Sequence, residues 1–124
     1  MSQESKCPVC RKMFKPNTHH HKYCSTECGN RAKKIKARYG IDSDTVVQMY
    51  KKQNGRCLLC NVKGDVHELG FYDRPVLVID HNHATGRVRG LLCSPCNLGL
   101  GKLQDDWEII YHAYRYVKKW DGVK

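Results

Sequence analysis

Apolar side chains recur at helical spacing in three segments of the chain, residues 27–38, 43–53 and 105–119. Positions three or four residues apart lie on one face of a helix, so each segment can bury an apolar face and expose a polar one. Gly40 and Gly55 follow the first two segments, and each supplies a stop signal. The pattern therefore predicts three helices.

A different pattern occupies residues 76–103. Residues 76–79 are a β-branched apolar run, residues 80–86 are polar and end in a turn, and residues 87–93 end in a second apolar run. Short apolar runs on either side of a polar turn predict a β-hairpin with a polar tip. Residues 97–103 contain two glycines and predict a short, loosened helix.

The predicted helix starts carry their own signals. Asp42 or Ser43 is suited to cap the second helix, because a short polar side chain accepts hydrogen bonds from free backbone N–H groups. Asp105 and Glu108 stand at capping-box spacing before the last helix. Five aromatic side chains of the last helix are expected to dock on the hairpin or on a second subunit, with stacking on bases as the alternative. They are Trp107, Tyr111, Tyr114, Tyr116 and Trp120. The helix also has an apolar stripe. The stripe consists of Ile109, Ile110, Ala113, Tyr116, Val117 and Trp120.

Large apolar side chains are few for a chain of 124 residues, so burial alone would give a marginal core. Eight cysteines are the candidates to stabilise it. They form two sets of two close pairs, and one such pair supplies two ligands of a tetrahedral zinc ion from a single turn. In a reducing compartment this spacing favours zinc over disulfides or free thiols. The sets are Cys7, Cys10, Cys24 and Cys28, and Cys57, Cys60, Cys93 and Cys96.

Both zinc ions are expected to be structural, because closed four-thiolate sites leave no position open for substrate. The first set has an alternative, in which His19, His20 or His21 replaces one cysteine. The other interpretation of these histidines is a solvated loop, with or without a phosphate contact. The second set encloses the predicted hairpin, so that insertion is where chemistry is expected.

The formal net charge is +10, from 22 Lys and Arg against 12 Asp and Glu. Most of the excess lies in residues 1–38, which favours an acidic polymer, nucleic acid above all, as the partner. The helix predicted at 27–38 is basic on most of its circumference and indicates contacts with a DNA backbone, with solubility alone as the alternative. Its candidate contacts are Arg31, Lys33, Lys34, Lys36 and Arg38.

No apolar run has the length that spans a bilayer, and no signal-like apolar segment precedes the first cysteines. No membrane partner is therefore expected. A cytoplasmic protein is predicted, in agreement with reduced, metal-binding cysteines.

The polar hairpin tip begins Asp80-His81-Asn82-His83. A carboxylate suits a hard cation such as Mg²⁺, and an imidazole that titrates near neutrality suits a general base acting on water. Neighbours on a strand point to opposite faces, so Asp80 and His81 share a site only if a turn or bulge follows Ile79. A polar tip without chemistry is the alternative.

The segment Val78–Asn97 reads VIDHNHATGRVRGLLCSPCN. It resembles the signature of the phage recombination endonuclease VII family, which belongs to the HNH or ββα-metal nuclease superfamily. The similarity covers about residues 57–106 with specific motifs and extends more loosely from Tyr39 into the last helix. Residues 7–38 are similar to zinc-finger extensions that precede some relatives.

The resemblance implies that Asp80 and Asn97 hold one Mg²⁺ or Mn²⁺ ion and that His81 activates water. His83 would assist at the metal or the phosphate, and the second cysteine set would hold the zinc that joins hairpin and helix. The family prototype has a glutamate three residues after the asparagine, where this chain has Leu100. Leu100 is therefore expected to pack in the core.

Arg87 and Arg89 flank Val88 on the second predicted strand, so both are expected on one face beside the metal. Phosphate contact is the functional interpretation, and a solvated strand face is the alternative. Phosphate contacts carry no base identity, so the sequence indicates no preferred DNA site.

Together these features predict a small zinc-stabilised α+β fold: a ββα-metal (His-Me finger) nuclease core with an N-terminal four-cysteine zinc finger and a C-terminal helix. Two domains are expected, residues 1–38 and 39–124. The predicted function is metal-dependent cleavage of phosphodiester bonds in DNA, by nicking or at branched junctions, and junction cleavage favours a homodimer. The alternatives are a non-catalytic zinc-dependent DNA-binding module and an RNA-directed or toxin-type nuclease. The resemblance implies a phage or prophage protein that acts in the bacterial cytoplasm.

Overall fold

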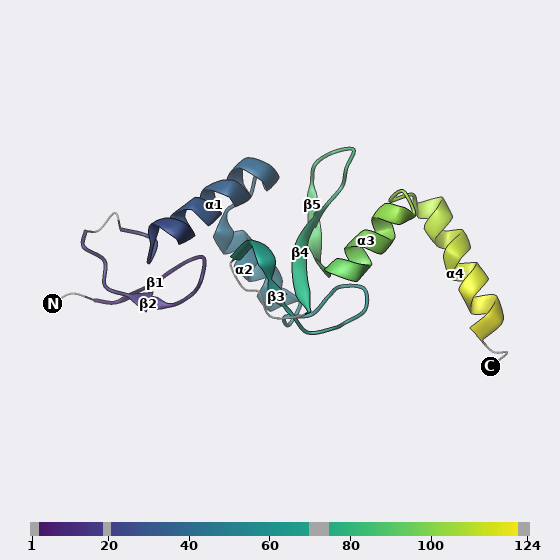
Figure 1. The fold of residues 1–124 in the computed structure, drawn as a ribbon, viewed down its shortest axis with the longest axis horizontal. Coiled ribbons are helices and arrows are strands. Elements are labelled where there is room, and N and C mark those ends of the chain that lie inside the picture. Colours follow the sequence, from purple (N-terminus) through teal and green to yellow (C-terminus); the bar gives the residue numbers. More distant parts are fainter. Residues whose placement is uncertain (1–2, 19–20, 70–74, 122–124) are drawn as a thin grey trace.

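The computed structural model describes residues 3–18, 21–69 and 75–121. It is a small α+β fold in which a central hairpin lies between helices (Figure 1). Strands β1 and β2 lie near the N-terminus, and α4 leads away from the hairpin toward the C-terminus. The elements are β1 (Ser5–Lys6), β2 (Met13–Phe14), α1 (Thr26–Tyr39), α2 (Ser43–Lys52), β3 (Asp65–Val66), the 3₁₀ turn η1 (His67–Leu69), β4 (Val76–His81), β5 (Val88–Cys93), α3 (Ser94–Lys102) and α4 (Trp107–Asp121).

Helices α1 and α2 begin and end where the sequence signals predict, within one residue. Ser25 caps α1 by accepting a hydrogen bond from the backbone N–H of Cys28 at 3.2 Å. Gly40 ends α1 in left-handed backbone with φ 73°, a conformation that a residue without Cβ adopts freely. Asp42 caps α2 by accepting from the N–H of Thr45 at 2.8 Å. Both predicted helices are confirmed.

The central sheet has the order β3-β4-β5, with β3 parallel to β4 and β4 antiparallel to β5. Strand β4 extends through Asp80 and His81, beyond the predicted strand. The register shifts at this step, since Asp80 pairs with Gly90 and His81 pairs with Val88. Arg89 is therefore the extra residue of a β-bulge. The sequence predicts a turn or bulge after Ile79. The structure has a bulge at this place, but its extra residue belongs to the partner strand, β5.

The chain after the hairpin departs from the prediction. Helix α3 begins at Ser94, earlier than expected, because Pro95 in its first turn already has helical φ. Helix α4 begins at Trp107. Its cap is Asp106, whose Oδ1 accepts hydrogen bonds from the backbone N–H groups two and three residues later, at 2.8 and 3.4 Å. The predicted capping role of Asp105 is wrong.

The core is shared by the N-terminal helices and the sheet. Helix α1 packs into the same buried cluster as the hairpin. The core is therefore continuous across the expected domain boundary between residues 38 and 39. The division into two domains stays a prediction. The side chains that are at most 2% exposed come from the first cysteine turn, the helices and the sheet. They are Cys7 and Val9 of the first cysteine turn, Ile35 of α1, Val46 of α2, Val66 of β3, Leu69 of η1, Leu77 of β4 and Leu91 of β5.

Helix α4 keeps its apolar stripe exposed. None of its described residues is buried, and Tyr116, Val117 and Trp120 are 70%, 63% and 55% exposed. The five aromatic side chains predicted to dock are all exposed, and their expected docking on the hairpin is wrong, because the bend between α3 and α4 directs α4 away from the sheet (Figure 1). Docking on a second subunit stays a prediction. Across the described residues, neither α4 nor any other helix is long and apolar enough to cross a bilayer.

Candidate active site and metal centres

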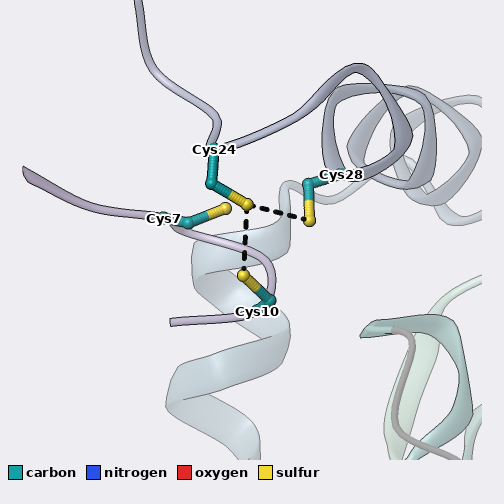
Figure 2. Close-up of side chains that lie close together, drawn as sticks. All are labelled: Cys7, Cys10, Cys24 and Cys28. Carbon is teal, nitrogen blue, oxygen red and sulfur yellow. Dashed lines mark hydrogen bonds between the residues drawn. The ribbon is translucent and has the colours of Figure 1, made fainter. Parts of the chain in front are cut away.

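The first cysteine set comes together between the β1–β2 hairpin and the start of α1. Figure 2 shows its four side chains pointing toward one another, and their sulfurs lie within 4.8 Å of each other. The Sγ atom of Cys24 is 3.4 Å from that of Cys10 and 3.6 Å from that of Cys28. Zinc–sulfur bonds of about 2.3 Å place the sulfurs of a tetrahedral site about 3.8 Å apart. The set Cys7, Cys10, Cys24 and Cys28 therefore fits a zinc ion.

Among the described residues, His21 is the histidine near this set, and it does not replace a cysteine. The Nδ1 atom of His21 accepts a hydrogen bond from the backbone N–H of Asn17 at 3.0 Å, and its ring packs on Phe14. His21 is thus a loop side chain, while the four cysteines supply a complete ligand set. His19 and His20 lie outside the described residues.

The second set joins distant parts of the fold. Cys57 and Cys60 lie in the turn after α2, Cys93 ends β5, and Cys96 lies in the first turn of α3. The sulfurs of Cys60 and Cys93 are 3.5 Å apart, and all four sulfurs lie within 4.8 Å of one another. A zinc ion bound here would fasten the end of α2, the hairpin and α3 together.

One thiol in each set is easy to ionise. Burial opposes ionisation of Cys7, but backbone N–H groups, first that of Cys24, donate to its sulfur and lower its pKa to about 6. Cys57 is likewise buried, yet the N–H groups of its neighbours lower its pKa to about 6. In contrast, burial and neighbouring thiols raise the pKa of Cys96 to about 12. Backbone N–H groups aimed at a sulfur also stabilise a metal-bound thiolate.

The residues expected to do chemistry line one cavity of about 300 Å³. The cavity lies where the end of α1, the η1 turn, the end of β4 and the start of α3 meet. Asp80 and His81 come from β4, His83 from the hairpin tip, and Asn97 from α3. Leu100 of α3 packs against the core, as expected. The fold thus brings the four predicted side chains to one place.

Asp80 is only 6% exposed, and Arg89 occupies both of its oxygens. The Nε atom of Arg89 donates to Oδ2 at 2.7 Å, and Nη2 donates to Oδ1 at 3.1 Å. Arg89 also donates to Asp105, from Nη2 to Oδ1 at 2.9 Å and from Nη1 to Oδ2 at 3.1 Å. Hydrogen bonds with Asp80 and then Asp105 raise the pKa of Arg89, so its charge is permanent.

The expectation that Arg87 and Arg89 project together from one strand face is wrong. The bulge breaks the alternation, and Arg87 precedes the first residue of β5. Arg87 is exposed at the hairpin tip, where its side chain is accessible to a phosphate. Arg89 already uses four of its five N–H groups on carboxylates.

His81 lies between two other rings. Its ring centre is 4.7 Å from that of His83 and 5.9 Å from that of Tyr39. The Tyr39 hydroxyl donates to Oε1 of Glu68 at 3.4 Å, an oxygen that also accepts from the N–H of Ile79 at 3.4 Å. Burial, followed by the charge of Glu68, raises the pKa of Tyr39, so this wall of the cavity is a neutral phenol. Oε2 of Glu68 is buried and has no hydrogen-bond partner among the described residues.

Sequence reasoning missed Tyr39 and Glu68 as members of this cavity. Glu68 lies in a segment without periodic pattern, so no local signal marks it. Tyr39 is the last residue of the basic helix α1, and its place at that end is the one feature of the sequence that could have indicated it.

The basic face of α1 leads into the same cavity. Arg31, Lys34 and Arg38 line an adjoining cavity of about 240 Å³, and Arg38 lines both. Lys33 and Lys36 are exposed and line neither of these two cavities. Of the five side chains predicted to contact a DNA backbone, three therefore lie beside the candidate active site and two lie away from it.

Residues 32–119 match the model of the recombination endonuclease VII family. The chain belongs to the recombination endonuclease VII family. The matched range contains the second cysteine set, both hairpin strands and most of α4, whereas the first cysteine set precedes it. The resemblance seen in the hairpin segment is confirmed.

Two phage proteins are similar to this member of the endonuclease VII family. The Gene 59 protein of Mycobacterium phage D29 is 35% identical over 104 residues, which are 82% of this chain and 59% of the relative. The Gene 59 protein of Mycobacterium phage L5 is 35% identical over 102 residues, 81% of this chain and 58% of the relative. The chain thus spans less than two thirds of these relatives.

Among solved structures, the crystal structure of the ββα-Me type II restriction endonuclease Hpy99I aligns with 94% of this chain and 66% of its own. The TM-score is 0.43 and the sequence identity is 22%.

Proposed function

We propose that this protein is a metal-dependent endonuclease that hydrolyses phosphodiester bonds in DNA, by nicking or at branched junctions. The observation that carries the proposal is the cavity that brings Asp80, His81 and Asn97 together at the end of a basic helix. A carboxylate, an imidazole and an amide oxygen are the groups that hydrolysis at a metal centre requires. Membership of an endonuclease family supports the same reaction.

Asp80 and Asn97 would hold one Mg²⁺ or Mn²⁺ ion. Carboxylate and amide oxygens are hard donors that suit these cations. Each oxygen of Asp80 accepts one hydrogen bond from Arg89, and a carboxylate oxygen has two acceptor positions, so each keeps one for a metal. The bound cation would supply stabilisation of the negative charge that builds on the phosphate and on the leaving 3′ oxygen.

His81 is the general base in this proposal. A ring nitrogen of its imidazole takes a proton from water, whose oxygen attacks phosphorus in line with the leaving 3′ oxygen. The bond from phosphorus to the 3′ oxygen breaks, and this oxygen takes a proton from solvent water, so the products are a 5′ phosphate and a 3′ hydroxyl. His83, with its ring centre 4.7 Å from that of His81, would assist at the metal or the phosphate.

The DNA backbone is proposed to run along α1. Arg31, Lys34 and Arg38 are the main phosphate contacts, and Arg38 reaches the reacting phosphate because it lines the catalytic cavity. The other lysines of this helix and Arg87 at the hairpin tip add positive charge around the path.

Branched-junction cleavage would require two active sites in a symmetric pair of copies. The exposed stripe of α4 is the surface that offers such a contact. The homodimer is therefore part of the proposal for that substrate, whereas nicking needs one copy.

The test is cleavage of supercoiled plasmid, linear duplex, a four-way junction and duplex RNA by the zinc-loaded protein. Each substrate is incubated with Mg²⁺, with Mn²⁺ and without added divalent cation. Asp80→Asn removes the proposed metal ligand, and Asp106→Asn is the matched control, because it removes one carboxylate charge at the α4 cap. Asparagine also caps helices well, so the control should keep its fold.

We expect cation-dependent cutting of DNA that Asp80→Asn loses and Asp106→Asn keeps. The preferred DNA then separates a nicking enzyme from a junction-cleaving one. No cutting of any substrate by folded protein that still binds DNA would overturn the proposal and leave a DNA-binding module. Preferential cutting of RNA would contradict the proposal that DNA is the substrate.

A further inference from the structure

Arg89 is held between two carboxylates that come from different elements. It is the bulge residue of β5, and its guanidinium bridges Asp80 of β4 to Asp105 in the turn between α3 and α4. The Nη2 atom bonds both carboxylates, at 3.1 Å to Asp80 and 2.9 Å to Asp105. The side chain of Asp80 is 8% exposed, that of Asp105 is 19% exposed and that of Arg89 is 36% exposed, so the bridge is best shielded from water at Asp80.

The chain reaches Asp105 through an uncommon backbone conformation. Gln104 and Asp105 both have positive φ, 61° and 50°. The N–H of Asp105 donates to the carbonyl of Leu100 at 2.8 Å, which closes the turn on α3. Asp tolerates left-handed backbone better than most residues, and such conformations persist where surrounding contacts hold them. The turn directs Asp105 toward β5, while the next residue, Asp106, caps α4.

The charge of the bridge bears on the proposed cation site. Asp80 paired with Arg89 alone would be neutral overall and would attract a divalent cation weakly. Asp105 adds one negative charge, so Asp80, Arg89 and Asp105 together carry a net charge of −1. The same contact fixes the guanidinium, which in turn orients the carboxylate of Asp80.

We propose that Asp105 is a positioning residue that acts through Arg89 to orient Asp80 and to preserve the negative charge with which Asp80 binds a divalent cation. This inference rests on the proposed function, because it takes Asp80 as a metal ligand. Arg89 is then a permanent part of the cation site rather than a phosphate contact.

The test is Mn²⁺ binding by the zinc-loaded protein without DNA, measured from the loss of the free Mn²⁺ signal in electron paramagnetic resonance. Asp105→Asn should weaken binding by about tenfold, the lower end of effects seen when a partner of a metal ligand is removed. Asp106→Asn is the matched control, since it removes the same charge one residue away and should leave binding within about twofold. Zinc content and melting temperature are measured alongside.

Two further variants make the result decisive. Arg89→Lys keeps the positive charge but loses the fork that bridges two carboxylates, so it should weaken Mn²⁺ binding as well. Asp105→Glu keeps the negative charge and should restore part of the affinity that Asp105→Asn loses. If Asp105→Asn lowers zinc content or the melting temperature, its Mn²⁺ affinity is not used. Weaker Mn²⁺ binding by Arg89→Lys than by Asp105→Glu then supports the positioning role, and normal binding by Arg89→Lys refutes it.

Asp80→Asn separates the two ways to fail. If it abolishes Mn²⁺ binding while Asp105→Asn and Arg89→Lys bind as the unchanged protein does, the role of Asp105 is refuted and the cation site stands. If Asp105→Asn and Asp106→Asn weaken binding equally, a general charge effect replaces the positioning role. If Asp80→Asn binds Mn²⁺ normally, the proposed cation site is wrong, and this inference fails with it.

Discussion

The two four-cysteine sets have the same ligands but organise different amounts of structure. The first takes its sulfurs from residues 7–28, a local unit that ends in the first turn of α1. The second joins Cys60 to Cys93 across 33 positions and encloses η1, β4 and β5. A metal bound between nearby residues shapes a local unit, whereas one bound across a long segment fixes tertiary positions. The second set therefore supports the candidate active site, and the first supports the basic helix that leads to it.

The largest expected difference is between Cys57→Ser and Cys24→Ser. Loss of the second zinc should abolish cleavage and the cooperative melting of the core, because structural zinc contributes about 10–16 kcal/mol in small domains, comparable with the whole stability of one. Loss of the first should mainly weaken DNA binding. Zinc per chain, thermal melting by circular dichroism and plasmid cleavage measure this. Equal losses in both variants would show that the sets do not differ in role.

His81→Ala tests whether phosphodiester cleavage depends on the segment that the second cysteine set encloses. Removal of a general base should reduce cleavage by about 10²- to 10⁴-fold. DNA affinity should be unchanged, since the basic face of α1 is intact. His112→Ala, an exposed histidine on α4, is the control and should cleave normally. Full cleavage by His81→Ala would remove His81 from the mechanism.

The binding role of α1 is tested by replacing Arg31, Lys34 and Arg38 together with glutamine. Each lost phosphate contact should lower the slope of log affinity against log salt by about 0.9, so the three together lower it by about 2.7. Deleting residues 1–38 would be a poor test, because it also removes Ile35 from the core. The control replaces three lysines outside this face, Lys102, Lys118 and Lys119. An equal change in slope for both variants would contradict the placement on α1.

The smallest expected effect concerns the junction between the two regions. Gly40→Ala should destabilise the protein by about 1–2 kcal/mol, because alanine resists the left-handed backbone at φ 73° that ends α1. Gly99→Ala, inside α3, should instead stabilise it by about 0.5–1 kcal/mol, since alanine favours helix. Both positions have open space around an added Cβ, so sterics do not separate them. Urea unfolding measures both, and the same sign for the two variants would contradict this account.

Local patterns in the sequence predicted much of this protein. Helices α1 and α2 followed from apolar spacing together with Asp42 and Gly40, because caps and periodicity act within a few residues. Both cysteine sets followed from ligand spacing. The grouping of Asp80, His81 and Asn97 came from the resemblance to a known family, because a strand and a later helix meet only in the folded chain.

Only the tertiary structure decided the rest. Asp105 and Asp106 are identical side chains in neighbouring positions, yet one bridges to Arg89 and the other caps α4, because backbone angles set by the α3–α4 turn aim them apart. Glu68 entered the cavity through the packing of η1 beside α1, which no local pattern encodes. The apolar stripe of α4 was visible in the sequence, but its exposure was not. Periodicity indicates which side chains share a face, and the path of the chain determines what that face meets.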